Sequence, residues 1–491
     1  MKHIIKIIST LLSIILIINI INLNIIPNKY LLIIISIELF LLLLGIILNI
    51  NKNKTIKIIG IILLIINIII NVIGLYYINN TNKFIKTSFN NNLVEMNKYN
   101  VIVLKESNYN NIEEIKTIGY LKQDINYKEK INNELKEYNS IYELYEDLLN
   151  KKIESIILED TYIDLLKDDY KDIEEKIKII YSFDITNEIK KQVETKELNP
   201  INIYISGSDS RSGRIESKSR TDVNMIVTIN PNTNKILLTS IPRDYYVQLH
   251  NTTGYKDKFT HSGIYGIEMS KQTLEDLFNI KIDYTIKVGF NSVVKIIDLL
   301  GGIDINSDMA FQCRCGDGVP SNRYIIEGNN HLNGAEALCF SRKRKVYQTG
   351  DNHRILNQQV VLEGIISKLT KEKSILIKYD EILNSLSDLY RTDIPESLIK
   401  LYIKNQLEKN TKWQIEKQVV TGYGSMDITY SMPGRNLYVM IPDMESVKKA
   451  TKNIKKSLSE SKKQTKIWQI HTFVLLYTIK KRGKPKWKKS I

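Results

Sequence analysis

The chain has 491 residues, which is too long for one ordinary domain and predicts a membrane region with two or three soluble units. Its formal charge of +15 suits nucleic acid, an anionic membrane or an anionic polymer, so charge alone selects no partner. The three cysteines form neither a disulfide framework nor a zinc-binding pattern, and the six histidines show no paired metal spacing.

Three apolar runs open the chain, at roughly residues 4–26, 31–50 and 58–78. Each has about the 20 residues needed to cross a bilayer. A cleaved signal peptide is the alternative for the first run, but the run is long for one and no small-residue cleavage site follows it. We therefore expect residues 1–80 to form three transmembrane helices.

Lysines in the short loops predict the orientation of these helices. The first loop has only Lys29, whereas the start of the chain and the second loop carry Lys2, Lys6, Lys52, Lys54 and Lys57. The N-terminus and second loop are therefore expected in the cytoplasm of a multi-pass protein of the cell membrane. Three crossings then place everything after about residue 80 outside, where a nucleic-acid partner is not expected.

Residues 81–98 are polar and rich in Asn, and predict a linker to an α/β accessory domain at 99–195. Apolar runs in that domain predict strands at 101–104, 118–121, 155–158 and 177–181, alternating with helices at 112–116, 141–149 and 162–166. We find no catalytic constellation in it, and expect an accessory role.

A second soluble unit is expected at 196–375. Strands are predicted at 201–205, 225–229 and 236–240, the last two joined as a hairpin by Asn230-Pro231-Asn232, with helices at 273–278, 292–300 and 356–369. This alternation predicts a layered α/β sandwich. A C-terminal α/β extension is expected at 376–460, with strands at 413–420 and 437–441 and a helix capped by Asp443, before a basic tail at 461–491.

Arginine is concentrated in the second unit. Only twelve of the 69 basic residues are arginines, and nine of these lie between Arg211 and Arg354. The guanidinium group is a rigid fork that binds phosphate through two hydrogen bonds and stays charged. A structural ion-pair network would also use arginines, but this clustering favours a site for a phosphorylated ligand.

The motifs around these arginines stand where strands and helices are expected to begin or end. Gly207-Ser208-Asp209-Ser210-Arg211 follows a strand, at the position where open α/β sheets bind ligands. Arg342 and Arg344 are two residues apart, and share one face if the segment is extended. Arg354 and Gln358 share a face near the start of a helix, itself an anion site. The other candidates are Arg220, Asp222, Arg243, Asp244 and Asp351.

Asp209 and Asp222 are the natural metal pair among these residues. Magnesium is commonly held by one or two carboxylates, water and the phosphates of the substrate. The two carboxylates could instead be salt-bridge partners of the arginines. No Walker-type loop is present, so we expect no nucleotide hydrolysis of the P-loop kind.

In order and spacing, these segments resemble the LytR-CpsA-Psr family of cell-envelope proteins over roughly residues 200–370. The resemblance rests on G-S-D-S-R, S-R-T-D, S-I-P-R-D, the segments Lys256–Gly266, Gly289–Ile305 and Leu332–Arg344, and G-D-N-H-R-I-L-N-Q-Q. The three spans and accessory unit resemble the capsule-type branch. Y-S-M-P-G-R and Y-V-M-I-P-D, between residues 422 and 454, resemble C-terminal extensions of the family.

The resemblance implies transfer of an anionic glycopolymer, such as teichoic acid or capsular polysaccharide, from undecaprenyl diphosphate to peptidoglycan. It assigns Mg²⁺ (or Mn²⁺) to Asp209 and Asp222. Catalytic roles are implied for these two residues with Arg243, Arg342 and Arg344. Pyrophosphate binding is implied for Arg220, Arg243, Lys258, Arg342, Arg344, Asp351, Arg354 and Gln358. Asn357 departs from the family, which often has arginine there.

Several alternatives stay open at this point. Transfer, hydrolysis by a pyrophosphatase and a non-catalytic polyprenyl-phosphate-binding regulator would use overlapping residues. Asp209, Asp222 and Asp244 are all candidates for the general base. Residues 288–290 and 293–300 are candidates for a lipid groove or for ordinary core. Cys339 is expected to be a buried structural thiol, while Cys313 and Cys315 either pair or stay free.

Overall fold

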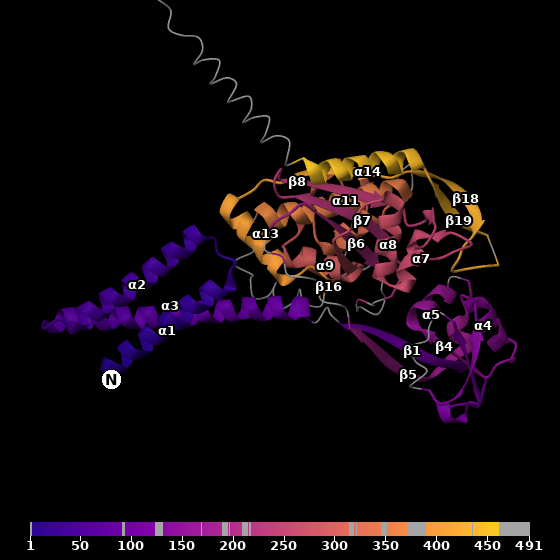
Figure 1. The fold of residues 1–491 in the computed structure, drawn as a ribbon, viewed down its shortest axis with the longest axis horizontal. Helices are drawn as coiled ribbons and strands as arrows, with labels where there is room; N and C mark the ends of the chain where they lie inside the picture. Colours follow the sequence, from indigo (N-terminus) through magenta and orange to yellow (C-terminus); the bar gives the residue numbers. More distant parts are fainter. Residues whose placement is uncertain are drawn as a thin grey trace, which may run out of the picture.

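The computed structural model describes residues 2–90, 94–122, 131–167, 169–188, 195, 197–208, 215, 218–313, 319–320, 322–344, 351–371, 389–434 and 436–460. The three apolar runs form the long helices α1 (Lys2–Leu23), α2 (Asn28–Ile50) and α3 (Lys54–Asn90), which project from the rest of the molecule (Figure 1). All three are long and apolar enough to cross a membrane. The prediction of three membrane helices is confirmed.

The predicted linker at 81–98 is wrong. Helix α3 continues to Asn90, and strand β1 begins at Val94. No proline occurs between Pro27 and Pro200. A helix nucleated in the apolar span can therefore propagate through the polar residues that follow.

Polar side chains meet inside the helix bundle around Glu38 of α2, which is 4% exposed. The Oε1 atom of Glu38 accepts hydrogen bonds from Ser13 Oγ of α1 at 2.6 Å and from Asn67 and Asn71 of α3 at 2.7 and 2.9 Å. A buried carboxyl group is costly unless it is hydrogen-bonded, and these contacts satisfy it while joining all three helices.

The accessory domain is built on a five-stranded sheet in the order β3-β2-β4-β1-β5. The strands are β1 (Val94–Leu104), β2 (Thr117–Leu121), β3 (Glu134–Tyr138), β4 (Ser155–Glu159) and β5 (Ile177–Glu188). Its helices include α4 (Ile141–Leu149), α5 (Asp160–Lys167) and α6 (Ile173–Lys176). The four predicted strands are confirmed. Strand β3 was missed because its sequence, Glu-Leu-Lys-Glu-Tyr, is polar at an edge of the sheet.

The second unit contains a six-stranded sheet in the order β16-β11-β6-β7-β8-β17. The strands are β6 (Ile201–Ser208), β7 (Val223–Asn230), β8 (Lys235–Ile241), β11 (Tyr284–Gly289), β16 (Tyr390–Thr392) and β17 (Gln414–Val419). Strands β7 and β8 form the predicted antiparallel hairpin. The pairs β6–β11 and β8–β17 are parallel.

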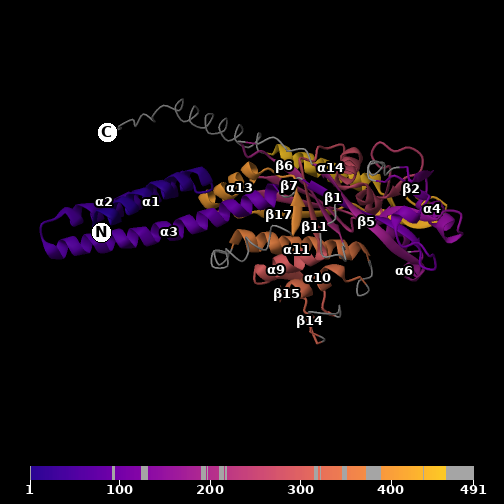
Figure 2. The ribbon, with the colours of Figure 1, turned by 90° about the horizontal axis from the view of Figure 1, so that it is seen from below.

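Helices cover both faces of this sheet (Figures 1 and 2). On one face, α8 (Ile267–Phe278) and α14 (Met444–Ser459) pack against Tyr204 and Ile226. On the other face, α11 (Asp351–Lys371) and α13 (Glu396–Lys409) pack against Ile203 and Val227. The α/β layered sandwich is therefore confirmed.

The predicted boundary at residue 375 is wrong, because the C-terminal segment supplies both edge strands of this sheet. Strand β16 pairs with β11, and β17 pairs with β8. Beyond them, β18 (Gly422–Ile428) and β19 (Asn436–Pro442) form a hairpin. Asp443 caps α14 as expected, since its side chain accepts a hydrogen bond from Glu445 N at 3.0 Å.

A small third core lies between α11 and the helices α9 (Phe290–Leu299) and α10 (Gly334–Arg342). It contains a disulfide between Cys313 and Cys339, which are 0% and 1% exposed. Cys339 was expected to be a thiol, and this expectation is wrong although its burial is confirmed. The pairing arises because β13 (Phe311–Gln312) packs beside α10, a contact between segments that local sequence does not encode.

Candidate functional site

The candidate site lies at the boundary of the large sheet where strands β6 and β8 end and strand β7 begins, which we call the sheet edge. Because β7 is antiparallel to both neighbours, Asp222, directly before β7, lies beside the ends of the other two strands. Asp222 N donates to Gly207 O at 2.8 Å. Arg243, two residues after β8, donates from Nη1 to Asp222 Oδ1 at 2.8 Å. The structure thus brings together two of the residues expected in the site.

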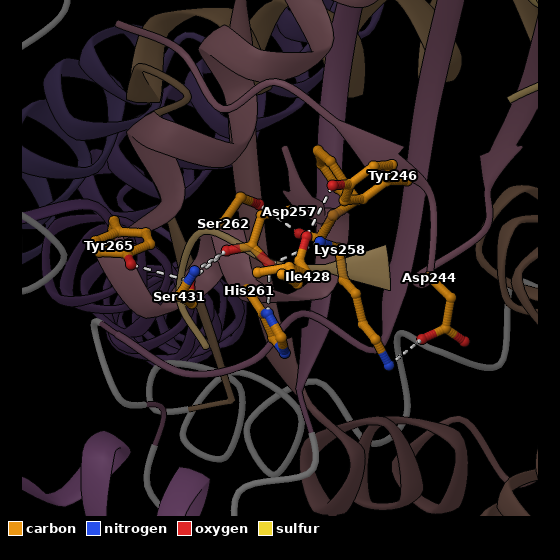
Figure 3. A network of polar contacts seen from close by, with 10 residues as sticks. Asp244, Tyr246, Asp257, Lys258, His261, Ser262, Tyr265, Ile428 and Ser431 are labelled. Carbon is orange, nitrogen blue, oxygen red and sulfur yellow. Dashed lines mark hydrogen bonds and ion pairs between the residues drawn. The ribbon is translucent and has the colours of Figure 1, made fainter. Parts of the chain in front are cut away.

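Lys258 joins this pair through Asp244. Lys258 lies on β10 (Asp257–Lys258), and its Nζ is 3.3 Å from Asp244 Oδ1 (Figure 3). Arg243 Nε is 3.6 Å from the other oxygen of Asp244. These four side chains are between 14% and 30% exposed, so they form an alternating row of charges that solvent and ligand can reach.

A buried network around Asp257 holds Lys258 in place, and the sequence did not predict it. Asp257 is 0% exposed and accepts hydrogen bonds from Lys258 N at 2.7 Å and from Ser431 N at 2.8 Å, as well as from the Ser431 hydroxyl. His261 Nδ1 lies 2.6 Å from Asp257 Oδ1 (Figure 3). The one local signal is the four-residue spacing of Asp257 and His261 within the segment Lys256–Gly266.

The backbone of the same segment is fastened to the strand ends. Phe259 N donates to Tyr245 O at 2.7 Å, and Thr260 N donates to Arg243 O at 2.8 Å. Short helix α7 (Phe259–Ser262) is therefore hydrogen-bonded directly to the residues that present Arg243 and Asp244.

A second buried network fixes Thr221, which stands between Arg220 and Asp222. Thr221 Oγ1 is 3.2 Å from Tyr204 Oη and 2.8 Å from Ser206 Oγ. Tyr204 also donates to Asn224 Oδ1 at 2.8 Å. Burial raises the pKa of Tyr204 to about 12, so the hydroxyl keeps its proton and remains a donor at neutral pH.

Arg342 contacts Phe290, and the ring of Phe290 lies at the sheet edge. It is the last residue of α10, and its guanidinium carbon lies 4.7 Å from the centre of the Phe290 ring. A Cβ atom placed on Gly207 would be 3.7 Å from Phe290 Cε1, so the same ring lies beside the end of β6. The expectation that Arg342 and Arg344 share a face of an extended segment is wrong, because α10 ends between them and Arg344 follows in an exposed loop.

The remaining predicted residues lie on α11 or beside β7. Asp351 is the first residue of α11, and its side chain is outside the described residues. Arg354 is 5% exposed, whereas Gln358 and Arg220 are half-buried. Asn357, the departure from the family pattern, donates to Phe340 O at 3.1 Å and so ties α11 to α10.

Asp209 and Arg211 lie outside the described residues. The described atoms that could bind a metal ion here belong to Asp222 and to Ser208, which is beside it. The Ser208 hydroxyl is buried and has no hydrogen-bond partner in the described part of the chain. Among the described residues, no group of three or more His, Cys, Asp or Glu side chains is placed to hold an ion. Magnesium needs only one or two carboxylates, so Asp222 with Asp209 and a hydroxyl oxygen fits it chemically.

A separate pocket of about 570 Å³ lies along the other side of α11, toward β12 (Ile303–Ser307). It is lined by polar and apolar side chains that include Asp304, Asp308, His353 and Leu356. None of the predicted site residues whose side chains the structure describes lines it.

Comparisons with known proteins show which proteins this chain is similar to. The model of the LytR_cpsA_psr family matches residues 166–456. A polyisoprenyl-teichoic acid–peptidoglycan teichoic acid transferase, TagU of Bacillus anthracis, is 33% identical over 198 residues, which are 40% of this chain and 61% of the relative. TagU of Bacillus subtilis is 30% identical over 280 residues, which are 57% of this chain and 85% of the relative.

Among solved structures, TagV of B. subtilis is 28% identical, covers 53% of this chain and 97% of its own, and has a TM-score of 0.43. The B. anthracis relative is matched over 61% of its length, and the B. subtilis TagU over 85%. Because the family model matches more than half of the chain, including the sheet edge that joins Asp222, Arg243 and Lys258, this chain belongs to the LytR-CpsA-Psr family.

Proposed function

We propose that this chain transfers an anionic cell-wall glycopolymer, of the teichoic acid or capsular polysaccharide type, from undecaprenyl diphosphate to peptidoglycan. The relatives named as teichoic acid transferases support the reaction class. The observation that carries the proposal is the ion pair of Arg243 with Asp222, because it sets a guanidinium fork beside a carboxylate at the ligand-binding edge of the sheet.

The diphosphate is the part of the donor that this site is suited to bind. Arg243 and Lys258 supply positive charge at the sheet edge, and Arg342 is held beside it by Phe290. Arg220, Arg344, Arg354, Asp351 and Gln358 complete the proposed pyrophosphate-binding set. Hydrogen bonds between ionised groups of this kind are each worth roughly 1.5–3 kcal/mol.

Asp209 and Asp222 would hold Mg²⁺ or Mn²⁺, which supplies charge neutralisation for the diphosphate and the leaving phosphate. Phosphoryl transfer needs little covalent help from the protein, so positioning and electrostatics dominate. Arg243 orients Asp222, and Lys258 orients Asp244, since each cation lies within 3.3 Å of its carboxylate partner. Asp209, Asp222 and Asp244 are the carboxylates available to accept the proton of the attacking sugar hydroxyl.

The membrane anchor keeps the site near a lipid-linked donor. The first loop and the soluble part lie at the same end of the helix bundle, because Lys29 Nζ donates to Glu408 O at 3.3 Å and Lys404 Nζ donates to Asn24 Oδ1 at 3.2 Å. This arrangement agrees with a cytoplasmic second loop and an extracytoplasmic soluble part. A buried disulfide, Cys313–Cys339, also favours an oxidising compartment.

The test uses the full chain in nanodiscs with a polyprenyl-diphosphate-linked polymer, Mg²⁺ and peptidoglycan oligomers. We expect a product whose mass equals polymer plus oligomer joined by a phosphodiester, and none when the oligomers are omitted. Release of free polymer phosphate with no joined product would identify a pyrophosphatase. Binding of the donor without turnover would identify a regulator. Either result would overturn the proposed transfer.

A further inference from the structure

The accessory domain contacts the segment that leads into the candidate site through Lys218. Glu159 ends β4, and its Oε2 lies 2.9 Å from Lys218 Nζ. Thr161 in α5 donates from Oγ1 to Lys218 O at 2.8 Å. The Glu159 side chain is 4% exposed and that of Lys218 is 18% exposed, so this ion pair is withdrawn from water. Two contacts from one domain therefore fix both the side chain and the backbone of a single residue in the other.

Lys218 begins the segment that carries Arg220 and Asp222. Its neighbour Ser219 donates from N to Gly263 O at 3.0 Å, and Thr221 N donates to Thr260 O at 3.1 Å. A Cβ atom on Gly263 would lie 2.3 Å from Ser219 O, so the two segments pack as closely as backbones can. The segment 218–222 is thus held on one side by the accessory domain and on the other by residues 260–263.

The accessory domain also packs against the residues that hold Lys258. Ile264 and Met432 are 1% and 3% exposed, and both belong to the hydrophobic core that α4 and α5 form on the accessory sheet. Met432 follows Ser431, which hydrogen-bonds to Asp257, and the Tyr265 hydroxyl lies 2.9 Å from Ser431 Oγ (Figure 3). Figure 1 shows α5 facing the region of α7.

We propose that Glu159 and Thr161 are positioning residues, through which the accessory domain sets the segment 218–222 and thereby the diphosphate site. This inference rests on the proposed function for its affinity and activity readouts, whereas the hydrogen-exchange readout is independent of it. Glu159 and Thr161 touch neither Asp222 nor Arg243. They act through Lys218, four residues before Asp222, by limiting the conformations of a segment that otherwise has little of its own secondary structure.

The ion pair of Glu159 with Lys218 can be tested by removing the charge of Glu159. Glu159→Gln keeps the volume of the side chain and the packing of β4 while removing the ion pair. The matched control is Glu106→Gln, which removes an ion pair with Lys151 in the same domain, at 2.8 Å, where both side chains are more than 60% exposed. Exposed pairs contribute little, so the control should behave as wild type.

Three measurements on the full chain in nanodiscs test the inference. The first is hydrogen exchange of the amides of Ser219, Thr221 and Asp222. The second is affinity for farnesyl diphosphate with Mg²⁺. The third is the separate effect on kcat and KM. For Glu159→Gln we expect exchange about tenfold faster at these amides and affinity about tenfold weaker, which corresponds to a coupling of ordinary size for contacting groups. Thr161→Val should act in the same direction.

A double-mutant cycle with Lys218→Met separates positioning from general destabilisation. In the Lys218→Met background, Glu159→Gln should change affinity by less than about twofold, because the partner is already absent. The full tenfold effect in that background, or a lower thermal midpoint with unchanged exchange and affinity, would overturn the inference. Exchange and affinity are measured without turnover. A wild-type chain that binds farnesyl diphosphate but transfers nothing would therefore contradict the proposed function alone.

Discussion

Arg243 donates to Asp222 at 2.8 Å across the ends of two adjacent strands, and this contact pairs one cation of the site with one carboxylate. Asp244 is held between Arg243 and Lys258, so each carboxylate has a cation beside it. An anionic ligand must compete with Asp222 and Asp244 for these cations. A divalent cation on Asp222 would weaken its hold on Arg243 and leave that guanidinium available to the ligand.

Replacing Arg243 with lysine should lower turnover by tens of fold. Lysine keeps the charge but cannot supply the fork that binds Asp222 and a phosphate together, and one lost charged hydrogen bond is worth roughly 1.5–3 kcal/mol. Kinetics with lipid-linked donor measure the effect. The matched control is Arg323→Lys, since Arg323 forms a structural ion pair with Glu336 at 3.0 Å. The control should change the thermal midpoint and leave turnover intact. Wild-type rates in Arg243→Lys would remove Arg243 from the site.

Asp222→Asn distinguishes a metal-holding carboxylate from a plain salt-bridge partner. If Asp222 only neutralises Arg243, the variant should be less stable and should bind diphosphate as well as wild type or better. We expect the other outcome, in which turnover collapses and the dependence on Mg²⁺ moves to higher concentrations, because magnesium uses one or two carboxylates. Magnesium titrations and thermal midpoints decide between them. Turnover that persists in chelator would contradict the metal assignment.

Two buried tyrosines should respond oppositely to loss of the hydroxyl. Tyr204→Phe breaks hydrogen bonds to Thr221 and Asn224, and should lower the free energy of unfolding by about 1–3 kcal/mol. Tyr145→Phe is the control, because the buried hydroxyl of Tyr145 has no hydrogen-bond partner among the described residues, and its loss should be neutral or stabilising. Chemical denaturation measures both. A larger loss in Tyr145→Phe would contradict this reading.

Tyr204 also predicts a dependence on alkaline pH. Its folded pKa of about 12 exceeds the ordinary value of 10, so the folded state holds the proton more tightly. The stability it contributes is therefore fully present below pH 10 and is lost as the pH rises toward 12. The unfolding free energy of Tyr204→Phe should fall less steeply than that of wild type across this interval.

Glu38 should be essential to the helix bundle. Glu38→Leu removes the acceptor shared by Ser13, Asn67 and Asn71, of which Ser13 and Asn71 keep acceptors on Asn67, while Glu38→Gln keeps a carbonyl oxygen. Interhelical hydrogen bonds in membranes are worth about 0.6 kcal/mol on average, so Glu38→Leu should lose about 2 kcal/mol or more. This loss of stability is measured as lower resistance of the helix bundle to sodium dodecyl sulfate, which energy transfer between labelled helices detects. Leu43→Ala, at a side chain 55% exposed, is the control. Equal resistance of Glu38→Leu and wild type would contradict this role.

Cysteine mapping checks the disulfide. After free thiols are blocked, we expect a peptide that links Cys313 to Cys339, with Cys315 as the alkylated residue. Reduction should lower the free energy of unfolding by about 3 kcal/mol, because it releases a loop closed across 26 residues. A Cys313–Cys315 link, one of the alternatives left open by the sequence, would show that the pairing is wrong.

Features fixed by local sequence were predicted well. The three membrane helices follow from apolar length, and the β7–β8 hairpin follows from Asn230-Pro231-Asn232, where Asn230 Oδ1 accepts from Asn232 N at 2.9 Å. Helix α14 follows from its capping residue Asp443. The pairing of Asp222 with Arg243 was also within reach, since both motifs lie at strand ends and antiparallel strands bring such ends together.

Features that depend on distant segments were missed. Asp257 and Ser431 are 174 residues apart, and no local pattern marks them as partners. Strands β16 and β17 were assigned to an extension because β-pairing has no period that identifies its partner strand. The end of α10 at Arg342 was missed for a related reason. Its capping box of Asn333 and Glu336 marks where the helix starts, but no glycine or proline marks where it stops.

The position of β17 in the sheet has a consequence for how the protein is made. Gln418 of β17 donates to Thr239 of β8, 179 residues earlier in the chain. Because synthesis starts at the N-terminus, β8 keeps an open edge until β17 has been made, and open edges are templates for pairing with other chains. A chain terminated before Gln414 would also lack α14, which covers one face of the sheet. The large sheet and its helical cover are thus complete only after residues 414–459 have been synthesised, and premature stop codons before Gln414 should yield aggregation instead of a smaller folded protein.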